Sequence, residues 1–448
     1  MSKTYDMTEG SPAKHLSVFA VPMLIGNLFQ QFYNLADSAI VGKFVSSDAL
    51  GSIGATGSLT FLLFSLCIGL ASGAGIIVSQ YFGAKEYENV KKTISNSTYV
   101  LMLCTIIMTI IGFVTARPIL VLLDTPESML EDAVIYMQTV CIGSIAIAGY
   151  NGVSSILRAL GDSKTPLVFL VAACAINIAL DFLFVVGFKT GVFGAALATV
   201  IAQALAAAGC FYYAWKKIDL CRLQKKHLKI DKRLWGKCIK IGVPMAFQSS
   251  MISISCLALQ RIVNGFGNDV VTAFTISGRV EQLVQQPFNS LGVALATFTG
   301  QNIGAGRIDR VKKGFRSAMV MNAVFSLLML GVMYLFGEYI VRIFVNESNV
   351  IGLGSSALRI TSCFFFFLGT IYIARSVLNG AGDTIFAMLN GFVEVIGRVG
   401  FALPLTGIPA VGKWGVWLTT GLTWFVTGVL CWLRYVQGKW KDKSIVDK

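Results

Sequence analysis

The chain has 448 residues, of which 55% are hydrophobic and only 13% are charged, whereas about 25% is ordinary in a soluble domain. This composition excludes a water-soluble globular protein, and the recurring apolar runs of about 20 residues are what bilayer-crossing helices require. The net charge of +14 does not indicate a nucleic-acid partner, because the basic residues fall at the ends of the apolar runs, where they set membrane orientation.

Twelve apolar segments predict an all-α integral membrane protein with twelve transmembrane helices. They cover residues 16–41, 52–80, 93–115, 130–158, 166–188, 190–214, 236–264, 273–303, 316–337, 353–378, 385–405 and 412–436. Alternate connections are rich in Lys and Arg, and the connection Lys216–Lys240 alone carries ten. The positive-inside rule then predicts a multi-pass protein of the plasma (inner) membrane with both termini in the cytoplasm.

The first predicted span carries a stripe of polar side chains. Asn27, Gln30, Asn34 and Asp37 recur at steps of three and four residues, which places them on one helix face. Contact between such a polar face and lipid is energetically unfavourable. We therefore expect this face of the helix to line a water-filled cavity or to pack against another helix through hydrogen bonds.

Pro22 lies about four turns before Asp37 on the same span. A proline inside a helix removes a backbone donor and permits a bend. One interpretation makes Pro22 a conformational hinge that couples ion binding at Asp37 to substrate release. The other places Pro22 at the first position of the helix, where its missing donor has no effect.

The fifth and sixth spans add further polar side chains. Asn177 and Asp181 are one helical turn apart, and Thr199 lies on the next span. Together with Asp37 they supply two carboxylates, an amide and a hydroxyl, which are oxygen ligands suited to sodium. Two neighbouring carboxyl groups suit a shared proton equally well. The structural alternative is a buried polar cluster that holds these helices together.

The second half of the chain is not equivalent to the first in its charged residues. The position that corresponds to Asp37 is Ala258 or Leu259. Glu281 is a candidate for attracting a cationic substrate. Glu394 is a second candidate, although its spacing from Arg398, one turn later, also predicts a structural ion pair within one helix.

The two halves nevertheless repeat one another. Counterparts at a constant spacing are Gln80 and Gln301, Lys91 and Lys312, and Gly161 and Gly382, while Pro22 and Pro244 are one residue further apart. Six spans per half give both halves the same orientation, which predicts a parallel repeat of two lobes. The expected organisation is a cytoplasmic N-terminal segment 1–14, an N-terminal six-helix lobe 15–214, a basic cytoplasmic linker 215–235, a C-terminal six-helix lobe 236–436 and a cytoplasmic tail 437–448.

Several of these motifs resemble the multidrug and toxic compound extrusion (MATE) family. They are Val21-Pro22-Met23, Asp37 within Leu-Ala-Asp-Ser-Ala-Ile-Val-Gly, the loop from Arg158 to Pro166 with sequence Arg-Ala-Leu-Gly-Asp-Ser-Lys-Thr-Pro, and Asn177-x-x-x-Asp181 followed by Thr199. The resemblance covers residues 13 to 436. It implies a two-lobed antiporter that exports amphipathic, often cationic drugs or toxins in exchange for protons or sodium, with the ion site of the N-terminal lobe at Asp37, Asn177, Asp181 and Thr199.

The resemblance also implies no cofactor besides the coupling ion, small-molecule amphipathic cations and the lipid bilayer as partners, and function as a monomer, because the cavity is complete within one chain. Some members of the family carry an acid on the seventh or tenth helix for a second ion site. This chain has neither, so a sodium site in its C-terminal lobe is not expected.

Four other classes of protein are alternatives to this transporter. A primary pump would need a G-x-x-x-x-G-K-[ST] loop, which is absent, and an enzyme is not expected because the only two histidines lie in polar flanking segments, without a catalytic motif. A lipid-linked saccharide flippase shares the architecture, and Arg279, Arg359, Arg375 and Arg398 keep that alternative open, since arginine binds pyrophosphate. A non-transporting scaffold of the same fold is the fourth.

Overall fold

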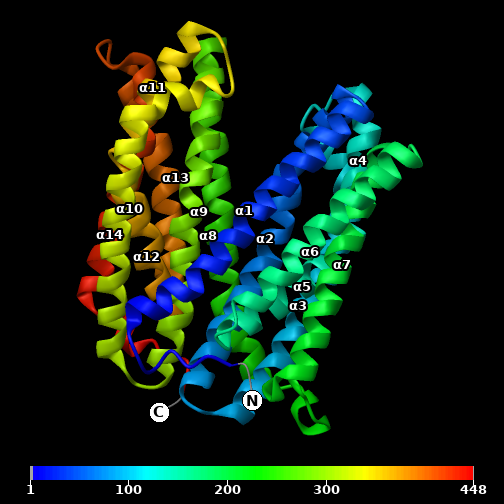
Figure 1. Ribbon diagram of the computed structural model, residues 1–448, viewed down its shortest axis with the longest axis vertical. Helices are drawn as coiled ribbons and strands as arrows, with labels where there is room; N and C mark the ends of the chain where they lie inside the picture. Colours follow the sequence, from blue (N-terminus) through cyan, green and yellow to red (C-terminus); the bar gives the residue numbers. More distant parts are fainter. Residues whose placement is uncertain (1–3, 447–448) are drawn as a thin grey trace. The chain divides into compact units, whose positions relative to one another are not determined.

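The computed structural model describes residues 4–446, and for residues 47, 58 and 257 only the backbone. All regular structure in this part of the chain is helical (Figure 1). The first half forms α1 (Pro12–Phe44), α2 (Ser47–Gly83), α3 (Tyr87–Leu122), α4 (Glu127–Ile142), α5 (Ser144–Ala159), α6 (Lys164–Asp181) and α7 (Gly191–Lys217). The second half forms α8 (Lys232–Val263), α9 (Asn268–Gly304), α10 (Ile308–Arg342), α11 (Ser348–Ser362), α12 (Phe365–Ala381), α13 (Thr384–Gly407) and α14 (Gly415–Gln437).

Twelve membrane-spanning segments account for these helices, as the sequence predicts. Within the described residues, nine helical segments are by themselves long and apolar enough to cross a bilayer, and the bent pairs α4–α5 and α11–α12 supply two more. The twelfth is α9, which has 37 residues but carries Arg279, Glu281 and several amides in its middle. A span with so many polar groups needs protein or water around it.

The sequence prediction was wrong in treating residues 130–158 and 353–378 as continuous helices. The first breaks at Gly143 between α4 and α5, which meet at 47°, and the second breaks at Cys363 and Phe364 between α11 and α12, which meet at 49°. The two breaks occupy equivalent positions in the repeat. Asn322 on α10 donates to the carbonyl of Phe366 (3.0 Å), so a side chain of the neighbouring helix is bonded to the first turn of α12, directly after the second break.

Three other predicted boundaries also need correction. The α-helix predicted over 166–188 ends at Asp181 and continues as a π-helix over Phe182–Gly187. The helices predicted at 93–115 and 316–337 begin earlier, at Tyr87 and Ile308. Their first turns are polar, and a hydropathy pattern does not detect helix that extends beyond the apolar run.

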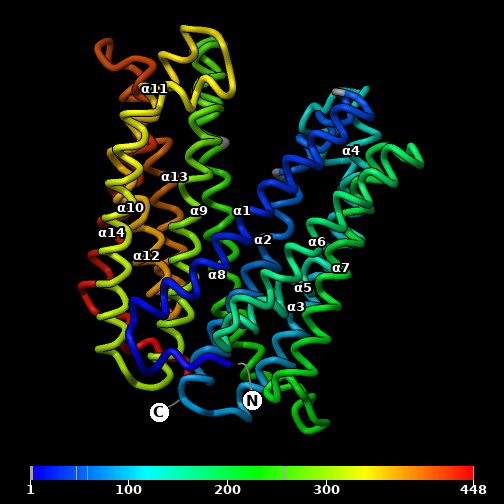
Figure 2. Tube along the Cα trace, in the orientation of Figure 1, coloured from blue at the N-terminus to red at the C-terminus, as the bar shows by residue number. Residues whose placement is uncertain are grey.

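The described chain divides into two compact units. Unit 1 contains Val21–Ala246 and the residues up to Met7, and unit 2 contains Thr8–Ala20 and the chain from Phe247 onward. The division therefore falls inside α1 and inside α8, through which the chain trace runs without interruption (Figure 2). It differs from the lobes 15–214 and 236–436 expected from the sequence. Of the predicted terminal segments, residues 1–3 and 447–448 lie outside the described part of the chain.

Specific contacts explain where the division falls. In unit 2, Arg307 donates to the carbonyl of Thr8 (2.6 Å) and Arg310 to the carbonyl of Gly10 (2.9 Å), which holds the segment before α1 to the start of α10. In unit 1, the linker after α7 is held by Asn96 of α3. Its side-chain oxygen accepts from the Asp231 amide (2.8 Å) and from the Trp235 indole (3.0 Å). The linker is thus a packed part of unit 1.

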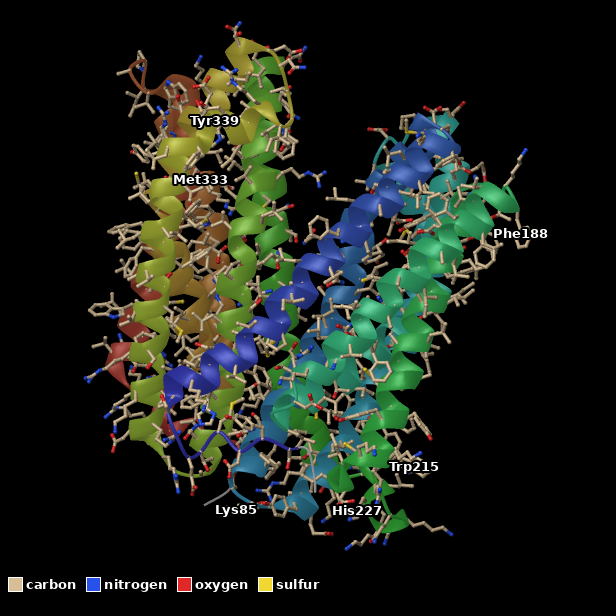
Figure 3. The ribbon with its side chains drawn as sticks, in the orientation of Figure 1. Lys85, Phe188, Trp215, His227, Met333 and Tyr339 are labelled. Carbon is tan, nitrogen blue, oxygen red and sulfur yellow. The ribbon has the colours of Figure 1, made fainter. Side chains whose placement is uncertain are left out.

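A buried histidine also fixes this linker. His227, labelled in Figure 3, is fully buried, and its Nε2 lies 3.1 Å from a carboxylate oxygen of Glu88 at the start of α3. Lys226 pairs with the same carboxylate at 2.8 Å. The basic character of the linker is therefore partly neutralised by the helix that it packs against.

Small residues set the packing in unit 1, where α2 packs on α3, α4 and α5, and α7 packs on α5 and α6. One face of α7 buries the alanines Ala195, Ala198, Ala202 and Ala206. Such small side chains let helix backbones approach closely, so that van der Waals packing can hold the helices together within a membrane. Unit 2 is centred on α9, α12 and α14 and fills its interior with aromatic side chains, including Phe288, Trp417 and Trp424.

Two equivalent glycines terminate α5 and α12. Gly161 has φ +91° and Gly382 has φ +98°, a left-handed conformation that glycine adopts without strain. A Cβ atom would lie 2.2 Å from the Tyr5 carbonyl oxygen at Gly161 and 2.6 Å from the Lys443 carbonyl oxygen at Gly382. The N-terminal segment therefore packs on the first turn, in unit 1, and the C-terminal tail packs on the second, in unit 2.

Candidate functional site

Two buried carboxyl groups meet inside unit 1. Asp37 of α1 is 8% exposed, and Asp181, the last residue of α6, is fully buried. Their side chains lie close enough to interact with each other, and a hydrogen bond between them would need a proton on one carboxyl group, because an ionised carboxylate only accepts. In the described part of the chain no donor reaches Asp37 Oδ1 or either oxygen of Asp181. The pair therefore needs a proton or a cation to offset its charge.

The helix geometry at Asp181 changes where the site requires it. The α-helix passes into the π-helix directly after Asp181, and such wide turns are frequent at functional sites because they redirect side chains. Asn177, one turn earlier, donates from Nδ2 to the hydroxyl oxygen of Thr199 on α7 (3.3 Å). The structure thus brings together all four residues that the sequence assigned to the ion site.

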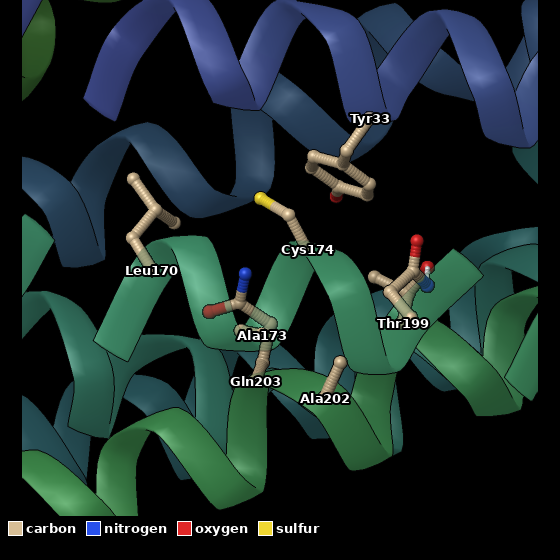
Figure 4. Close-up of a pocket in the computed structure, with 8 residues that line it drawn as sticks. Tyr33, Leu170, Ala173, Cys174, Thr199, Ala202 and Gln203 are labelled. Atoms are coloured by element: carbon tan, nitrogen blue, oxygen red, sulfur yellow. Dashed lines mark hydrogen bonds between the residues drawn. The ribbon is translucent and has the colours of Figure 1, made fainter. Parts of the chain in front are cut away.

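The donor set suits a small, hard cation or a proton. Asn177 Oδ1 is buried with no hydrogen-bond partner in the described part of the chain, and the Thr199 hydroxyl keeps a free lone pair. A cavity of about 10 Å³ lies beside them, which is the space of about one water molecule. It is lined by Tyr33, Leu170, Ala173, Cys174, Asn177, Thr199, Ala202 and Gln203 (Figure 4).

Two tyrosines belong to this site that the sequence did not identify. Tyr33 of α1 lies over the cavity (Figure 4) and within electrostatic range of both carboxyl groups, as does Tyr136 of α4. Tyr33 precedes Asp37 by one helical turn, so the spacing could have revealed it. No pattern marked Tyr136, because its position depends on the packing of α4 against α7.

The rest of the polar stripe on α1 has a different environment. Gln30 and Asn34 are exposed on unit 1 and Asn27 is half-buried, so the stripe is continuous with the buried site only at Asp37. Exposure of Gln30 and Asn34 is compatible with the cavity-lining role expected from the sequence. It does not fit the alternative in which the whole stripe is sealed against a neighbouring helix.

Pro22 is an interior residue of α1, which begins at Pro12. The interpretation of Pro22 as the first residue of the helix is therefore wrong. Its missing donor leaves the carbonyl of Val18 without the usual helical partner, and the boundary between the two compact units falls between Ala20 and Val21. Pro244 occupies the same place in α8, two residues before the second boundary.

Unit 2 holds a separate charged cluster. Arg375 of α12 forms an ion pair with Glu394 of α13 and donates to Asn390 Oδ1 (2.7 Å). The interaction of Glu394 with Arg398, which the one-turn spacing suggested, is replaced by this pair between two helices. Glu281 of α9 is half-buried and forms no ion pair within the described residues. Of the two acidic candidates, only Glu281 thus has a carboxylate without an ion pair in the described part of the chain.

Comparisons with known proteins cover nearly the whole chain. A family model, described as MatE, matches residues 22–183 and 244–403, one match in each half of the repeat. The probable multidrug resistance protein YpnP of Bacillus subtilis is 30% identical over 449 residues, which is 99% of each chain. The multidrug export protein MepA of Staphylococcus aureus is 24% identical over 411 residues, 89% of this chain and 90% of MepA.

Solved structures share the fold. A multidrug resistance MATE family transporter of the MOP superfamily, in an outward-facing conformation, is similar with a TM-score of 0.91 and 21% identity over 98% of both chains. A MOP superfamily transporter from Pyrococcus furiosus, for which a reverse polarity of the binding pocket suggests a different function, is similar with a TM-score of 0.89 and 22% identity over 97% of this chain and 98% of its own.

Proposed function

Because the chain belongs to the MATE family of multidrug transporters, we propose that it is an antiporter that exports amphipathic cations in exchange for protons or sodium ions. Its matched relatives are named multidrug resistance and multidrug export proteins, so the chain is a multi-pass membrane transporter of small molecules and not an enzyme. The relatives favour this class over the lipid-linked saccharide flippase.

The observation that carries the ion coupling is the buried contact of Asp37 with Asp181. Two carboxyl groups in one apolar site cannot both stay ionised without a compensating charge. Entry of a proton or a sodium ion from the outside supplies that charge, and its release to the inside restores the repulsion. The site therefore has two states of different charge, and an ion gradient can drive an antiporter between them.

Asn177 and Thr199 complete the ion site in this proposal. When sodium is the coupling ion, Asn177 Oδ1, the Thr199 hydroxyl and the two carboxylates are its ligands. When a proton is the coupling ion, it resides between the Asp37 and Asp181 carboxyl groups, and the amide and hydroxyl hold Asp181 in place. Both ions use the same side chains, so the choice between them is left to experiment.

Pro22 links the ion site to the movement of α1. It lies about four turns from Asp37 on one helix, where the missing backbone donor makes bending cheap. Ion binding at Asp37 changes how strongly the outer part of α1 is held to α6. We assign to Pro22 the hinge that transmits this change, and to Asn27, Gln30 and Asn34 the polar wall of the substrate cavity.

Glu281 is assigned the attraction of the cationic substrate, because its carboxylate lies in unit 2 without an ion pair to any described residue. Glu394, our second candidate, is neutralised by Arg375 and is assigned to holding that arginine. The protein is further proposed to act as a monomer in the plasma membrane, with both termini in the cytoplasm. The distribution of Lys and Arg among the connections supports this orientation.

The test is efflux of ethidium from liposomes that contain the purified protein, under an imposed proton gradient or an imposed sodium gradient. We expect flux under one of the gradients and its loss in Asp37→Asn. Asp124→Asn is the matched control, since Asp124 is exposed between α3 and α4, and should leave flux unchanged. Unaltered flux in Asp37→Asn would remove ion coupling from unit 1. No flux under either gradient would overturn the export of cations.

A further inference from the structure

The charged cluster of unit 2 contains two arginines whose environments differ sharply. Arg375 has a full set of acceptors. Besides Glu394 and Asn390, the side-chain oxygen of Gln248 accepts from its Nε and Nη1 at 3.1 Å each when the amide is oriented toward it. Its charge and its donors are therefore satisfied within the protein, as a buried guanidinium requires.

Arg398 is buried to the same extent but is not satisfied. It is 7% exposed, and its only hydrogen-bond acceptor in the described residues is the thiol of Cys256 on α8, at 2.6 Å from Nη1. A neutral thiol is a weak acceptor and carries no charge. The Nε atom of Arg398 has no partner in the described part of the chain. Membrane proteins rarely retain such a cation without a functional reason.

Glu281 provides the opposite charge close by. It lies within electrostatic range of Arg398, from α9, yet no ion pair joins the two in the described residues. Cys256 is exposed, so the cluster reaches the surface of unit 2 on the side of Arg398. Tyr372, whose hydroxyl donates to Gln285 (3.1 Å), is also within electrostatic range of Arg398 and supplies an aromatic surface beside it.

This arrangement discriminates between ligand charges. A simple cation attracted to Glu281 is repelled by Arg398, and a simple anion at Arg398 is repelled by Glu281. A molecule that carries both charges satisfies both side chains, with a carboxylate on the planar guanidinium and an ammonium on Glu281. We infer that unit 2 contains a recognition site for zwitterionic amphiphiles, formed by Arg398 and Glu281. This inference rests on the proposed export function and makes its substrate class more specific.

The experiment compares two dyes that differ only in the charge to be tested. Rhodamine B carries a carboxylate and a delocalised cation, and its ethyl ester carries only the cation. Binding of each dye to the purified protein is followed by fluorescence anisotropy, and gradient-driven efflux is followed separately in liposomes. We expect Arg398→Gln to weaken binding of rhodamine B by roughly tenfold or more, while binding of the ester changes by less than about twofold or strengthens.

Two further variants separate recognition from folding. Glu281→Gln should weaken the binding of both dyes, because both dyes carry the cation. Arg359→Gln is the matched control, since Arg359 is an exposed arginine of α11 whose guanidinium lies 6.0 Å from the Tyr334 ring centre, and it should leave both dyes unaffected. Each variant is first checked for a monodisperse elution profile.

The outcomes distinguish this inference from the proposed function. If Arg398→Gln weakened the binding of both dyes equally, or of neither dye, the zwitterion site would be overturned. Wild-type protein that binds only the ester would overturn it as well. Selective binding that depends on Arg398, without efflux of either dye under any gradient, would support the site and contradict the export function.

Discussion

Replacement of Arg375 by methionine tests how strongly unit 2 depends on the buried ion pair of Arg375 with Glu394. The side chains of Arg375 and Glu394 are 8% and 5% exposed. Arg375→Met leaves the Glu394 carboxylate without a counter-charge and Asn390 Oδ1 without its donor. Breaking a buried pair from one side costs about 3–5 kcal/mol. At about 2–4 °C per kcal/mol for a unit of this size, the melting temperature should fall by roughly 6–20 °C.

The measurement is loss of the monomer elution peak after heating in detergent, with Trp fluorescence as a second readout. The double variant Arg375→Met with Glu394→Met should recover at least half of the loss, because removal of both charges also removes the uncompensated one. Arg359→Met, which removes an exposed arginine, should shift the melting temperature by no more than about 3 °C. A single variant as stable as wild type would refute the reasoning, and so would a double variant less stable than either single one.

Two further substitutions test the hinge and the linker. Pro22→Ala restores a helical donor to α1 and should reduce ion-driven efflux roughly tenfold without lowering the melting temperature. Pro118→Ala, at another interior proline, is the control and should leave efflux unchanged. Normal efflux in Pro22→Ala would contradict the role of Pro22 as a hinge. Asn96→Ala leaves the Asp231 amide and the Trp235 indole without their acceptor, at about 1–3 kcal/mol each, and should speed tryptic cleavage of the linker after α7, measured by gel time course. Asn151→Ala is the control, because among the described residues the Asn151 side chain bonds only within its own helix. Equal cleavage rates in Asn96→Ala and wild type would show that Asn96 does not hold the linker.

Most of the fold can be predicted from the sequence, because few backbone structures can span a bilayer. Apolar length predicts the spans, and a constant spacing between counterparts such as Gln80 and Gln301 predicts the parallel repeat. Local breaks escaped prediction, since the residues on both sides of Gly143 are mostly apolar. Whether a glycine breaks a helix or allows close packing depends on its neighbours in space, which a single sequence does not list.

The two charged sites differ in how far the sequence predicts them. Asp37, Asn177, Asp181 and Thr199 stood out because polar residues are costly in apolar spans, and the structure brings them together. In unit 2 the spacing of Glu394 and Arg398 suggested a pair within α13, but Glu394 pairs with Arg375 instead. One-turn spacing brings two side chains near one another, yet the shape of the helix packing decides which partner is reached.

The turns at Gly161 and Gly382 bear on how the two ends of the chain can be altered. The repeat places the same left-handed glycine, which leaves room for a passing backbone, at the corresponding turn of each half. The segments that pack on these turns are not copies, because one comes from the beginning of the chain and the other from its end. The two halves therefore share the turn, and a different terminal segment packs on it in each half. A fusion partner or affinity tag at either end will compete with the terminal segment for its place on the turn. The loss of stability that a tag causes should therefore depend on which of the two segments it displaces.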